Sequence, residues 1–521
     1  MTVPTIQTVV IGEADLTFGD VVAVARGGAR VELSASSLEA LAAGRALVDK
    51  LAAAPTPAYG ISTGFGALAT RHIDPEMRAQ LQRSLIRSHA AGMGPLVEPE
   101  VIRALVLMRL KTLATGHTGV RPAVAQTMAA LLNAGITPAV REYGSLGCSG
   151  DLAPLSHVAL VLMGEGEVVG ADGVSAIEAG PVLAEHGIEP LELAPKEGLA
   201  LINGTDGMLG MLILALGDLT ELVKIADISA AMSVEALLGT DKVFRPELHA
   251  IRPHPGQAAS AANLLKVLHG SAIMESHREP NECTRVQDAY SLRCAPQVAG
   301  AARDTMAHAA TVAERELASI VDNPVVLLAD GRVESNGNFH GAPVAMVLDF
   351  LAIAAADLGS IAERRTDRML DVARSHGLPA FLADDPGVDS GLMIAQYTQA
   401  ALVSENKRLA VPASVDSIPS SAMQEDHVSM GWSAARKLRT AVDNLRRILA
   451  VELVAAARAL ELRAPLDPAA GTGAAVRALR EAGVGGPGPD RFLSPELRAA
   501  EDAVKAGAVL AAVEAAVGPL N

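Results

Sequence analysis

Five long stretches with apolar residues at helical spacing dominate the chain beyond Asn203. They run from about 205 to 239, 285 to 320, 341 to 365, 390 to 411 and 423 to 462. Each exceeds an ordinary globular helix in length, which is typical of a bundle of long, nearly parallel helices. Hydrophobic residues make up 50% of the chain but aromatic residues only 2%, so small aliphatic side chains must fill the interior. We therefore predict a mainly α fold, an elongated bundle of long central helices with a smaller N-terminal region.

The chain is divided here into three sequential regions. Residues 1–203 form the N-terminal region, 204–465 the central helix bundle and 466–521 a C-terminal helical tail. In the first region, Ser36 and Glu39 have capping-box spacing and predict a helix that ends before Pro55. A second helical pattern covers 99–135, and glycine-broken apolar runs at 160–195 indicate a little β-structure.

Charge and cysteine content exclude several classes of protein. A formal net charge of -16 without a Lys/Arg-rich run argues against nucleic-acid binding. Three cysteines are too few for a disulfide framework in 521 residues, so we expect a reducing, cytoplasmic environment. Residues 1–12 lack a signal-peptide pattern, and the most apolar stretch, Met208 to Leu216, is too short to cross a bilayer, so no membrane association is expected.

The segment from Gly144 to His157, GSLGCSGDLAPLSH, contains a tripeptide whose backbone could cyclise. If the nitrogen of Gly150 attacks the carbonyl of Cys148 and Ser149 loses its hydroxyl, two waters leave and a 4-methylidene-imidazol-5-one ring (MIO) remains. Such a ring is a carbon electrophile, which none of the twenty side chains provides. A Cβ at Gly150 would resist the compression that ring closure needs. On its own, a Ser-Gly pair usually indicates a turn.

The whole fourteen-residue string resembles the cofactor-forming motif of the aromatic amino acid ammonia-lyases. This family acts on histidine, phenylalanine or tyrosine and includes related aminomutases. The resemblance implies an MIO formed from Cys148, Ser149 and Gly150, with Asp151 supporting its formation and with no metal. The family mostly has Ala where this chain has Cys148, but only the backbone of that residue enters the ring. The resemblance also implies a helical architecture of the fumarase/aspartase type.

Further segments, spread from about residue 56 to 433, resemble the same family. Tyr59 opens the glycine-rich string YGISTGFG, and the resemblance implies that it is the base for the β-proton. His89 lies in RSHAAG and is implied to contact the substrate ring. Asn203, in LINGT, is implied to hold the amino group or the cofactor oxygen, although Asn before Gly is also common at a helix start.

Two later segments supply the other implied substrate contacts, Gln287, Arg293 and Phe339. They also supply Tyr290, implied to be catalytic by stabilising charge on the cofactor oxygen together with Asn203. Gln287, Tyr290 and Arg293 are spaced by three residues each, so on a helix or tight turn they share a face. Arg293 is suited to bind a carboxylate with two hydrogen bonds, and its alternative is a surface salt bridge. Phe339, in NGNFHG, is implied to pack against the substrate from a neighbouring subunit.

The string Gln424-Glu425-Asp426-His427 bears on the substrate. It resembles the histidine-specific members of the family, whereas phenylalanine and tyrosine enzymes carry Asn-Gln-Asp. A carboxylate at Glu425 can accept a hydrogen bond from an imidazole N–H and would have no such partner in a phenyl ring. An exposed helical Glu is the structural alternative.

Taken together, the resemblance implies non-oxidative deamination of L-histidine to trans-urocanate and ammonia. It also implies a homotetramer in which one chain supplies Tyr59, His89, Asn203, the cofactor and Glu425. One neighbour would then supply Tyr290 and Arg293, and another neighbour Phe339.

Four alternatives remain at this point. The chain could act on another aromatic amino acid, or it could be a 2,3-aminomutase, which returns ammonia to the β-carbon. A serine hydrolase using Ser149 is a different class, but the segment lacks the G-x-S-x-G elbow. A helical binding protein without activity would keep the long helices without needing the site residues.

Overall fold

The computed structural model describes residues 7–54, 60–64, 71, 73–147, 150–278 and 286–521. The chain forms two compact units, each assembled from separate stretches of sequence. The first unit comprises Met1–Leu214, Ala310–Asp349 and Pro412–Arg436, and the second comprises Ala215–Ala309, Phe350–Val411 and Lys437–Asn521. The two units group residues that are in contact in space. The three regions expected above are consecutive stretches of sequence, so the two divisions are not directly comparable.

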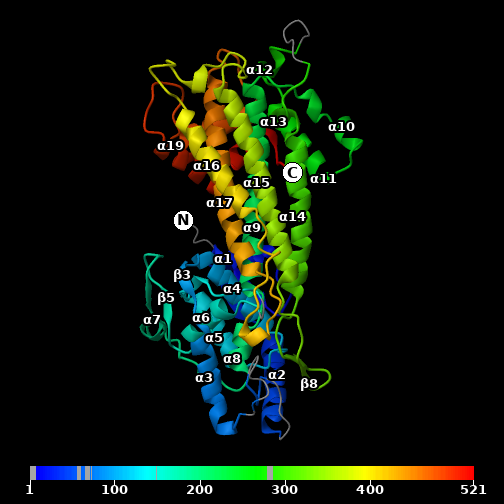
Figure 1. Cartoon of the computed structure of the whole chain (residues 1–521), viewed down its shortest axis with the longest axis vertical. Helices are drawn as coiled ribbons and strands as arrows, with labels where there is room; N and C mark the ends of the chain where they lie inside the picture. The colour runs from blue at the N-terminus through cyan, green and yellow to red at the C-terminus, as the bar shows by residue number, and fades with distance from the viewer. Residues whose placement is uncertain (1–6, 55–59, 65–70, 72, 148–149, 279–285) are drawn as a thin grey trace. The chain divides into compact units, whose positions relative to one another are not determined.

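Most of the described chain is α-helical, which confirms the predicted mainly α fold (Figure 1). The four longest helices are α9 (Asp206–Ala236), α14 (Ala295–Ala318), α15 (Ala342–Leu370) and α17 (Gly431–Glu461). Four of the five boundaries between the units fall within these helices, and the fifth lies between Val411 and Pro412. The helices match four of the five predicted stretches, and α16 (Met393–Leu409) matches the other.

The first unit contains shorter helices and two-stranded sheets. Its helices are α1 (Phe18–Ala25), α2 (Ala35–Ala53), α3 (Arg78–His89), α4 (Pro99–Leu113), α5 (Pro122–Asn133), α6 (Leu152–Leu162), α7 (Ala179–Glu185) and α8 (Glu197–Ile202). Its strands are β1 (Thr8–Ile11) parallel to β2 (Arg30–Leu33), and the antiparallel pairs β3 (Met93–Leu96) with β4 (Arg141–Tyr143), β5 (Glu167–Val169) with β6 (Ala176–Glu178), and β7 (Val325–Leu327) with β8 (Arg332–Glu334). The β5–β6 hairpin confirms the β-structure expected at 160–195.

Two local predictions in this unit are wrong. The N-cap of α2 is Ser34, whose side chain accepts a hydrogen bond from the Ser37 N–H, so the helix does not begin with the predicted Ser36–Glu39 box. The pattern at 99–135 is two helices, because the chain turns at Gly116 and Gly119, both with positive φ. At Gly116 an added Cβ would overlap the carbonyl oxygen of Ala40 in α2, so this turn packs directly against the neighbouring helix.

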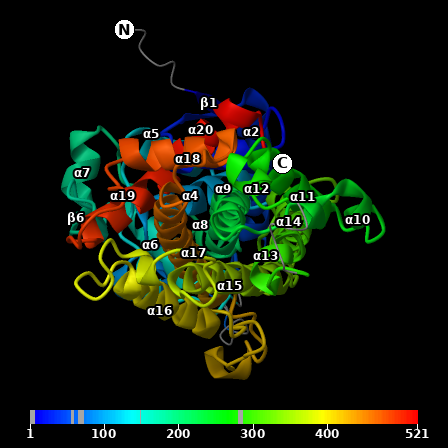
Figure 2. The same ribbon diagram turned by 90° about the horizontal axis from the view of Figure 1, so that it is seen from above.

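The second unit packs helices against one another through small and aliphatic side chains. Its own helices are α10 (Pro246–Ala250), α11 (Pro255–Leu268), α12 (Ala272–Glu275), α13 (Tyr290–Arg293), α16, α18 (Ala470–Glu481), α19 (Ser494–Lys505) and α20 (Ala508–Val517). The side-chain amides of Gln399 and Asn406 in α16 donate to the carbonyls of Ile448 and Ala441 in α17, at 2.8 and 3.0 Å. Near the C-terminus, α18 lies against α20 (Figure 2).

Helix α15 corrects one expectation about apolar segments. By length and composition it could cross a membrane, whereas the sequence analysis considered only Met208 to Leu216. In the structure, 61% of its most apolar 18-residue stretch is buried. Core helices of globular proteins can have the same length and composition. That the chain does not associate with a membrane therefore stays a prediction.

Candidate active site

Gly150 is pressed against Gly204 at the start of the predicted cofactor segment. Its φ is +79°, in the left-handed region, and an added Cβ would overlap the backbone of Gly204. The N–H of Asp151 donates to the Gly204 carbonyl at 2.7 Å, closing a short parallel bridge between the two segments. Only glycine fits here, as the sequence predicted. Cys148 and Ser149 lie outside the described residues, and so does Tyr59.

Gly147 joins this segment to the one that follows Glu425. Its carbonyl accepts a hydrogen bond from the hydroxyl of Ser429 at 2.7 Å, and the Met430 N–H donates to the Leu146 carbonyl at 2.8 Å. Gly147 has a φ of +66°, and a Cβ there would overlap the Ser429 hydroxyl. Two motifs separated by about 280 residues in sequence are therefore in direct contact.

Asp151 is fully buried at the N-terminus of α9. Its Oδ2 accepts hydrogen bonds from the N–H groups of Gly207 and Met208 at 2.8 and 3.0 Å, and its Oδ1 accepts one from Ser145 at 3.0 Å. Burial raises the pKa of this carboxyl from 3.8 to about 7, although the three hydrogen bonds oppose the rise. Near neutral pH the group can therefore hold or release a proton beside Gly150.

Asn203 follows α8 and is almost fully buried. Its Nδ2 donates to the carbonyl of Asn323 at 2.8 Å, and its own carbonyl accepts from the guanidinium of Arg109. Its Oδ1 is buried with no partner among the described residues. A buried acceptor without a donor is costly, so this atom is suited to receive a hydrogen bond from a cofactor or substrate.

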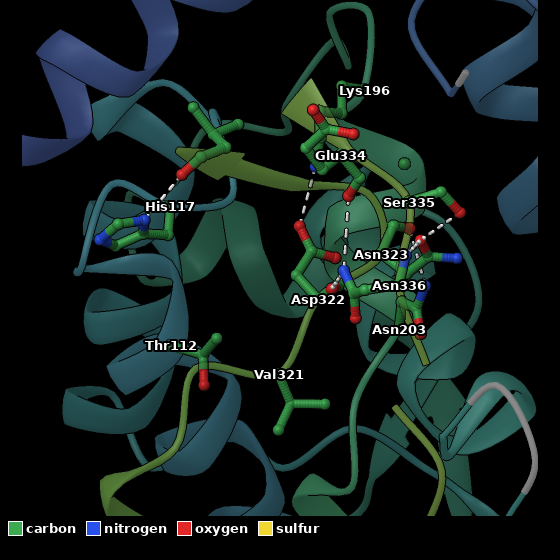
Figure 3. A network of polar contacts seen from close by, with 12 residues as sticks. Thr112, His117, Lys196, Asn203, Val321, Asp322, Asn323, Glu334, Ser335 and Asn336 are labelled. Atoms are coloured by element: carbon green, nitrogen blue, oxygen red, sulfur yellow. Dashed lines mark hydrogen bonds and ion pairs between the residues drawn. The ribbon is translucent and has the colours of Figure 1, made fainter. Parts of the chain in front are cut away.

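A buried ionic group lies close to Asn203, and Figure 3 shows its members Lys196 and Asp322. Arg109 also donates to the carbonyl of Val321 at 2.8 Å, and Lys196 pairs with Asp322 at 2.8 Å with both side chains fully buried. Burial raises the pKa of Asp322 and lowers the pKa of Lys196, while their mutual attraction opposes both shifts. This group was not predicted from the sequence. Its signal was Arg109, a charged residue within the otherwise apolar stretch Ala104–Leu110 of α4.

Glu425 lies in an extended segment before α17, so the predicted stretch at 423–462 begins eight residues too early. It pairs with Ser420 in an antiparallel bridge, and its carboxylate accepts from the Ser420 hydroxyl at 3.1 Å. Between them, residues 421–423 all have positive φ without being glycine, a strained turn that presents Glu425 half-buried.

Phe339 and Glu425 lie on segments joined by a histidine pair. The rings of His340 and His427 stack with centroids 5.8 Å apart, and His340 Nε2 donates to the His427 carbonyl at 3.1 Å. Phe339 itself is half-buried. The structure thus brings the segments of Gly150, Asn203, Phe339 and Glu425 into the first unit.

His89 is the last residue of α3, also in the first unit. Its Nδ1 lies 2.9 Å from the carbonyl of Leu85, which can only accept, so Nδ1 carries the proton. The half-buried ring therefore has Nε2 as its acceptor nitrogen.

Gln287, Tyr290 and Arg293 belong to the second unit. Tyr290 begins α13 and is 72% exposed, and the Arg293 guanidinium lies 4.7 Å from the centre of its ring. Gln287 and Arg293 line one cavity of about 520 Å³ together with His277, Arg278 and Asp288. The guanidinium is therefore accessible to an anionic ligand from this cavity.

The sequence and structural comparisons agree on one class of protein. A family model described as aromatic amino acid lyase matches residues 16–481. The chain belongs to the aromatic amino acid lyase family, a family of carbon–nitrogen lyases.

Individual relatives narrow this class. The chain is 73% identical over 514 residues to a histidine ammonia-lyase of Streptomyces avermitilis, covering 99% of this chain and 100% of the relative. Among solved structures, it is similar to a tyrosine aminomutase from Streptomyces globisporus (TM-score 0.93, 41% identity, 99% and 100% of the two chains covered). It is also similar to a histidine ammonia-lyase from Trypanosoma cruzi (TM-score 0.89, 38% identity, 98% and 96% covered).

Proposed function

We propose that this chain is a histidine ammonia-lyase, which converts L-histidine to trans-urocanate and ammonia. The observation that carries the proposal is the 73% identity, over almost the whole chain, to the histidine ammonia-lyase of Streptomyces avermitilis. The half-buried carboxylate of Glu425 agrees with it, because an imidazole N–H is a donor that a phenyl ring lacks.

The proposed cofactor is MIO, formed from Cys148, Ser149 and Gly150. Three described features fit it: the left-handed Gly150 against Gly204, the protonatable Asp151, and the unpaired Oδ1 of Asn203. When formed, the group supplies an electrophilic carbon that makes loss of the amine feasible. Asp151 is suited to move a proton during the dehydration that forms it, and Asn203 is suited to hold it or the substrate amine.

The remaining residues would bind the substrate and move its β-proton. Arg293 binds the carboxylate with two charge-assisted hydrogen bonds, and Glu425 and His89 orient the imidazole. Tyr59 accepts the β-proton, which requires stabilisation of its phenolate because an ordinary tyrosine titrates near pH 10. Tyr290 stabilises negative charge beside the site.

We further propose a cytoplasmic homotetramer whose sites combine residues of several chains. Exposure of Tyr290 supports this assembly, because a catalytic side chain that is 72% exposed needs a further surface to exclude water. Val286, four residues earlier, is 99% exposed. On the same unit, Phe350 and Ile353 of α15 and Val298 of α14 line an apolar groove of about 520 Å³.

A 2,3-aminomutase is the second candidate, and the structural similarity to the tyrosine aminomutase from Streptomyces globisporus favours it. The two reactions share their first half, so only product analysis separates them. A β-amino acid, rather than free ammonia and an unsaturated acid, would identify the aminomutase.

The deciding experiment offers L-histidine, L-phenylalanine and L-tyrosine separately to the purified protein and follows urocanate absorbance and ammonia release. We expect turnover of L-histidine and a loss of at least tenfold in kcat/KM for Glu425→Gln, because a neutral amide pairs less well with imidazole. Mass spectrometry of the peptide spanning 148–150 should show the loss of two waters in the wild type but not in Ser149→Ala. Full activity of Ser149→Ala would refute the proposal.

A further inference from the structure

Asn323 connects the two segments of the first unit that carry Asn203 and Phe339. Its backbone carbonyl accepts the hydrogen bond from Asn203 Nδ2 at 2.8 Å. Its side-chain Oδ1 accepts from the Asn336 N–H at 2.9 Å and from the Ser335 hydroxyl at 3.0 Å (Figure 3). We propose that Asn323 is a positioning residue for the reaction proposed above. It holds Asn203 and the Phe339 segment of its own chain, which serve different sites of the proposed homotetramer.

The contact with Asn203 decides which end of its amide faces the site. Because Nδ2 is engaged by a carbonyl, Oδ1 is turned the other way and stays unpaired among the described residues. Rotation of the amide by half a turn would place two oxygens together, which is unfavourable. The contact with Asn323 thus leaves the acceptor Oδ1 of Asn203, and not its donor Nδ2, facing the site.

The segment that carries Asn323 cannot shift easily. Asp322 is held by the buried ion pair with Lys196, and the Val321 carbonyl by Arg109, which also donates to the carbonyl of Asn203. Moving residues 321–323 would leave these buried charges without their partners, which is strongly unfavourable. Asn323 is therefore a fixed reference point for both of its partners.

On the other side, hydrogen bonds rather than core packing hold the turn before Phe339. Ser335 and Asn338 are exposed, so they bury little apolar surface. Asn336 donates from Nδ2 to the Asp322 carbonyl at 3.0 Å and accepts at Oδ1 from the Asn338 N–H at 2.9 Å. Loss of the Asn323 side chain would remove two of the bonds that fix this turn, and Phe339 follows it directly.

The test compares Asn323→Ala with Asn323→Asp, which retains an oxygen at the Oδ1 position, and with Ser335→Ala, which removes one exposed donor. The first readout is hydrogen exchange of the peptide spanning 335–341, which does not depend on activity. We expect faster exchange in Asn323→Ala, near-wild-type exchange in Asn323→Asp and a small change in Ser335→Ala. Unchanged exchange in Asn323→Ala would overturn the proposal.

The second readout is kinetics with the substrate that the wild type turns over. We expect kcat/KM to fall about tenfold in Asn323→Ala, with recovery in Asn323→Asp, and less than additive loss when Asn323→Ala is combined with Phe339→Leu. Additive losses, or wild-type kinetics in Asn323→Ala, would contradict the positioning role. If Asn323→Ala does not fold, Asn323→Ser, whose hydroxyl cannot reach Asn336, takes its place. A wild type inactive on L-histidine contradicts only the proposed function, because the exchange experiment still tests Asn323.

Discussion

Asp151 combines full burial with hydrogen bonds to two N–H groups at the start of α9. The N-terminus of α9 favours the anion, whereas burial favours the neutral acid, and burial prevails in raising the pKa to about 7. A carboxyl that is easily protonated at neutral pH is suited to the backbone dehydration proposed for Cys148–Gly150. The same property has a measurable effect on stability.

Because the folded pKa of Asp151 lies above its ordinary value of 3.8, the native state binds more protons than the unfolded state between about pH 4 and 7. Its contribution to the free energy of unfolding is therefore complete below pH 4 and falls as pH rises toward 7. Between pH 5 and 7 the free energy of unfolding of the wild type should fall by about 2.5 kcal/mol relative to that of Asp151→Asn. Urea unfolding of both proteins at both pH values measures this difference. The control Asp172→Asn, at a solvated position, should show no such gap, and a pH-independent difference for Asp151→Asn would disprove the expectation.

At the residue scale, the sequence predicts glycine positions well and buried polar partners poorly. The need for glycine at position 150 could be inferred because backbone conformation is a local property. The roles of Arg109 and Asn323 could not, because their partners are close only after folding: Arg109 donates to the carbonyls of Asn203 and Val321, and the Asn323 carbonyl accepts from Asn203 Nδ2. Asp322-Asn323-Pro324 reads as an ordinary turn in the sequence.

At the element scale, the long helices were predictable because apolar periodicity over many turns is a strong signal, but their ends were not. The stretch at 285–320 becomes two helices, α13 and α14, since the chain breaks at Cys294 between them. The stretch at 423–462 loses its first residues to the extended segment of Glu425, whose backbone is fixed by Ser420 and, through Ser429, by Gly147. Contacts distant in sequence thus set these boundaries.

A buried charge pair links long helices within the second unit. Arg365 of α15 bonds to Glu452 of α17 with Nη2 to Oε2 at 2.9 Å, and Ser229 and Ser233 of α9 donate to the same carboxylate at 2.8 and 2.7 Å. With the bond from Arg365 Nε to Oε1 at 2.5 Å, four bonds converge on one fully buried group, so removing a single partner has a large effect.

Arg365→Met should lower the free energy of unfolding by about 3 to 5 kcal/mol, because Glu452 would stay buried without its counter-charge. The double variant Arg365→Met with Glu452→Gln should recover most of the loss, since the neutral amide oxygen still accepts from one serine and the amide NH2 donates to the hydroxyl oxygen of the other. Denaturant titration of the three proteins measures this. A double variant as unstable as Arg365→Met alone would show that lost packing, not the unpaired carboxylate, is responsible.

For the whole molecule, the distribution of site residues between the two units has a consequence for assembly. Gly150, Asn203 and Glu425 belong to the first unit, and Gln287, Tyr290 and Arg293 to the second. In the proposed homotetramer, these two sets meet between different chains. Two inactive variants, one defective in each set, should then complement each other.

Ser149→Ala and Arg293→Lys, each nearly inactive alone, should regain activity when their subunits are mixed during refolding. Random mixing gives about a quarter of the sites an intact cofactor from one chain and an intact Arg293 from another. Ser149→Ala mixed with Glu425→Gln is the matched control. Both defects then lie in the set of residues that one chain supplies to a site. Every chain in this mixture carries one of the two defects, so no site has both residues intact. No activity in the first mixture would mean that each chain completes its own site. Restored activity in the control would mean that Ser149 and Glu425 of one site come from different chains, which contradicts the proposed arrangement.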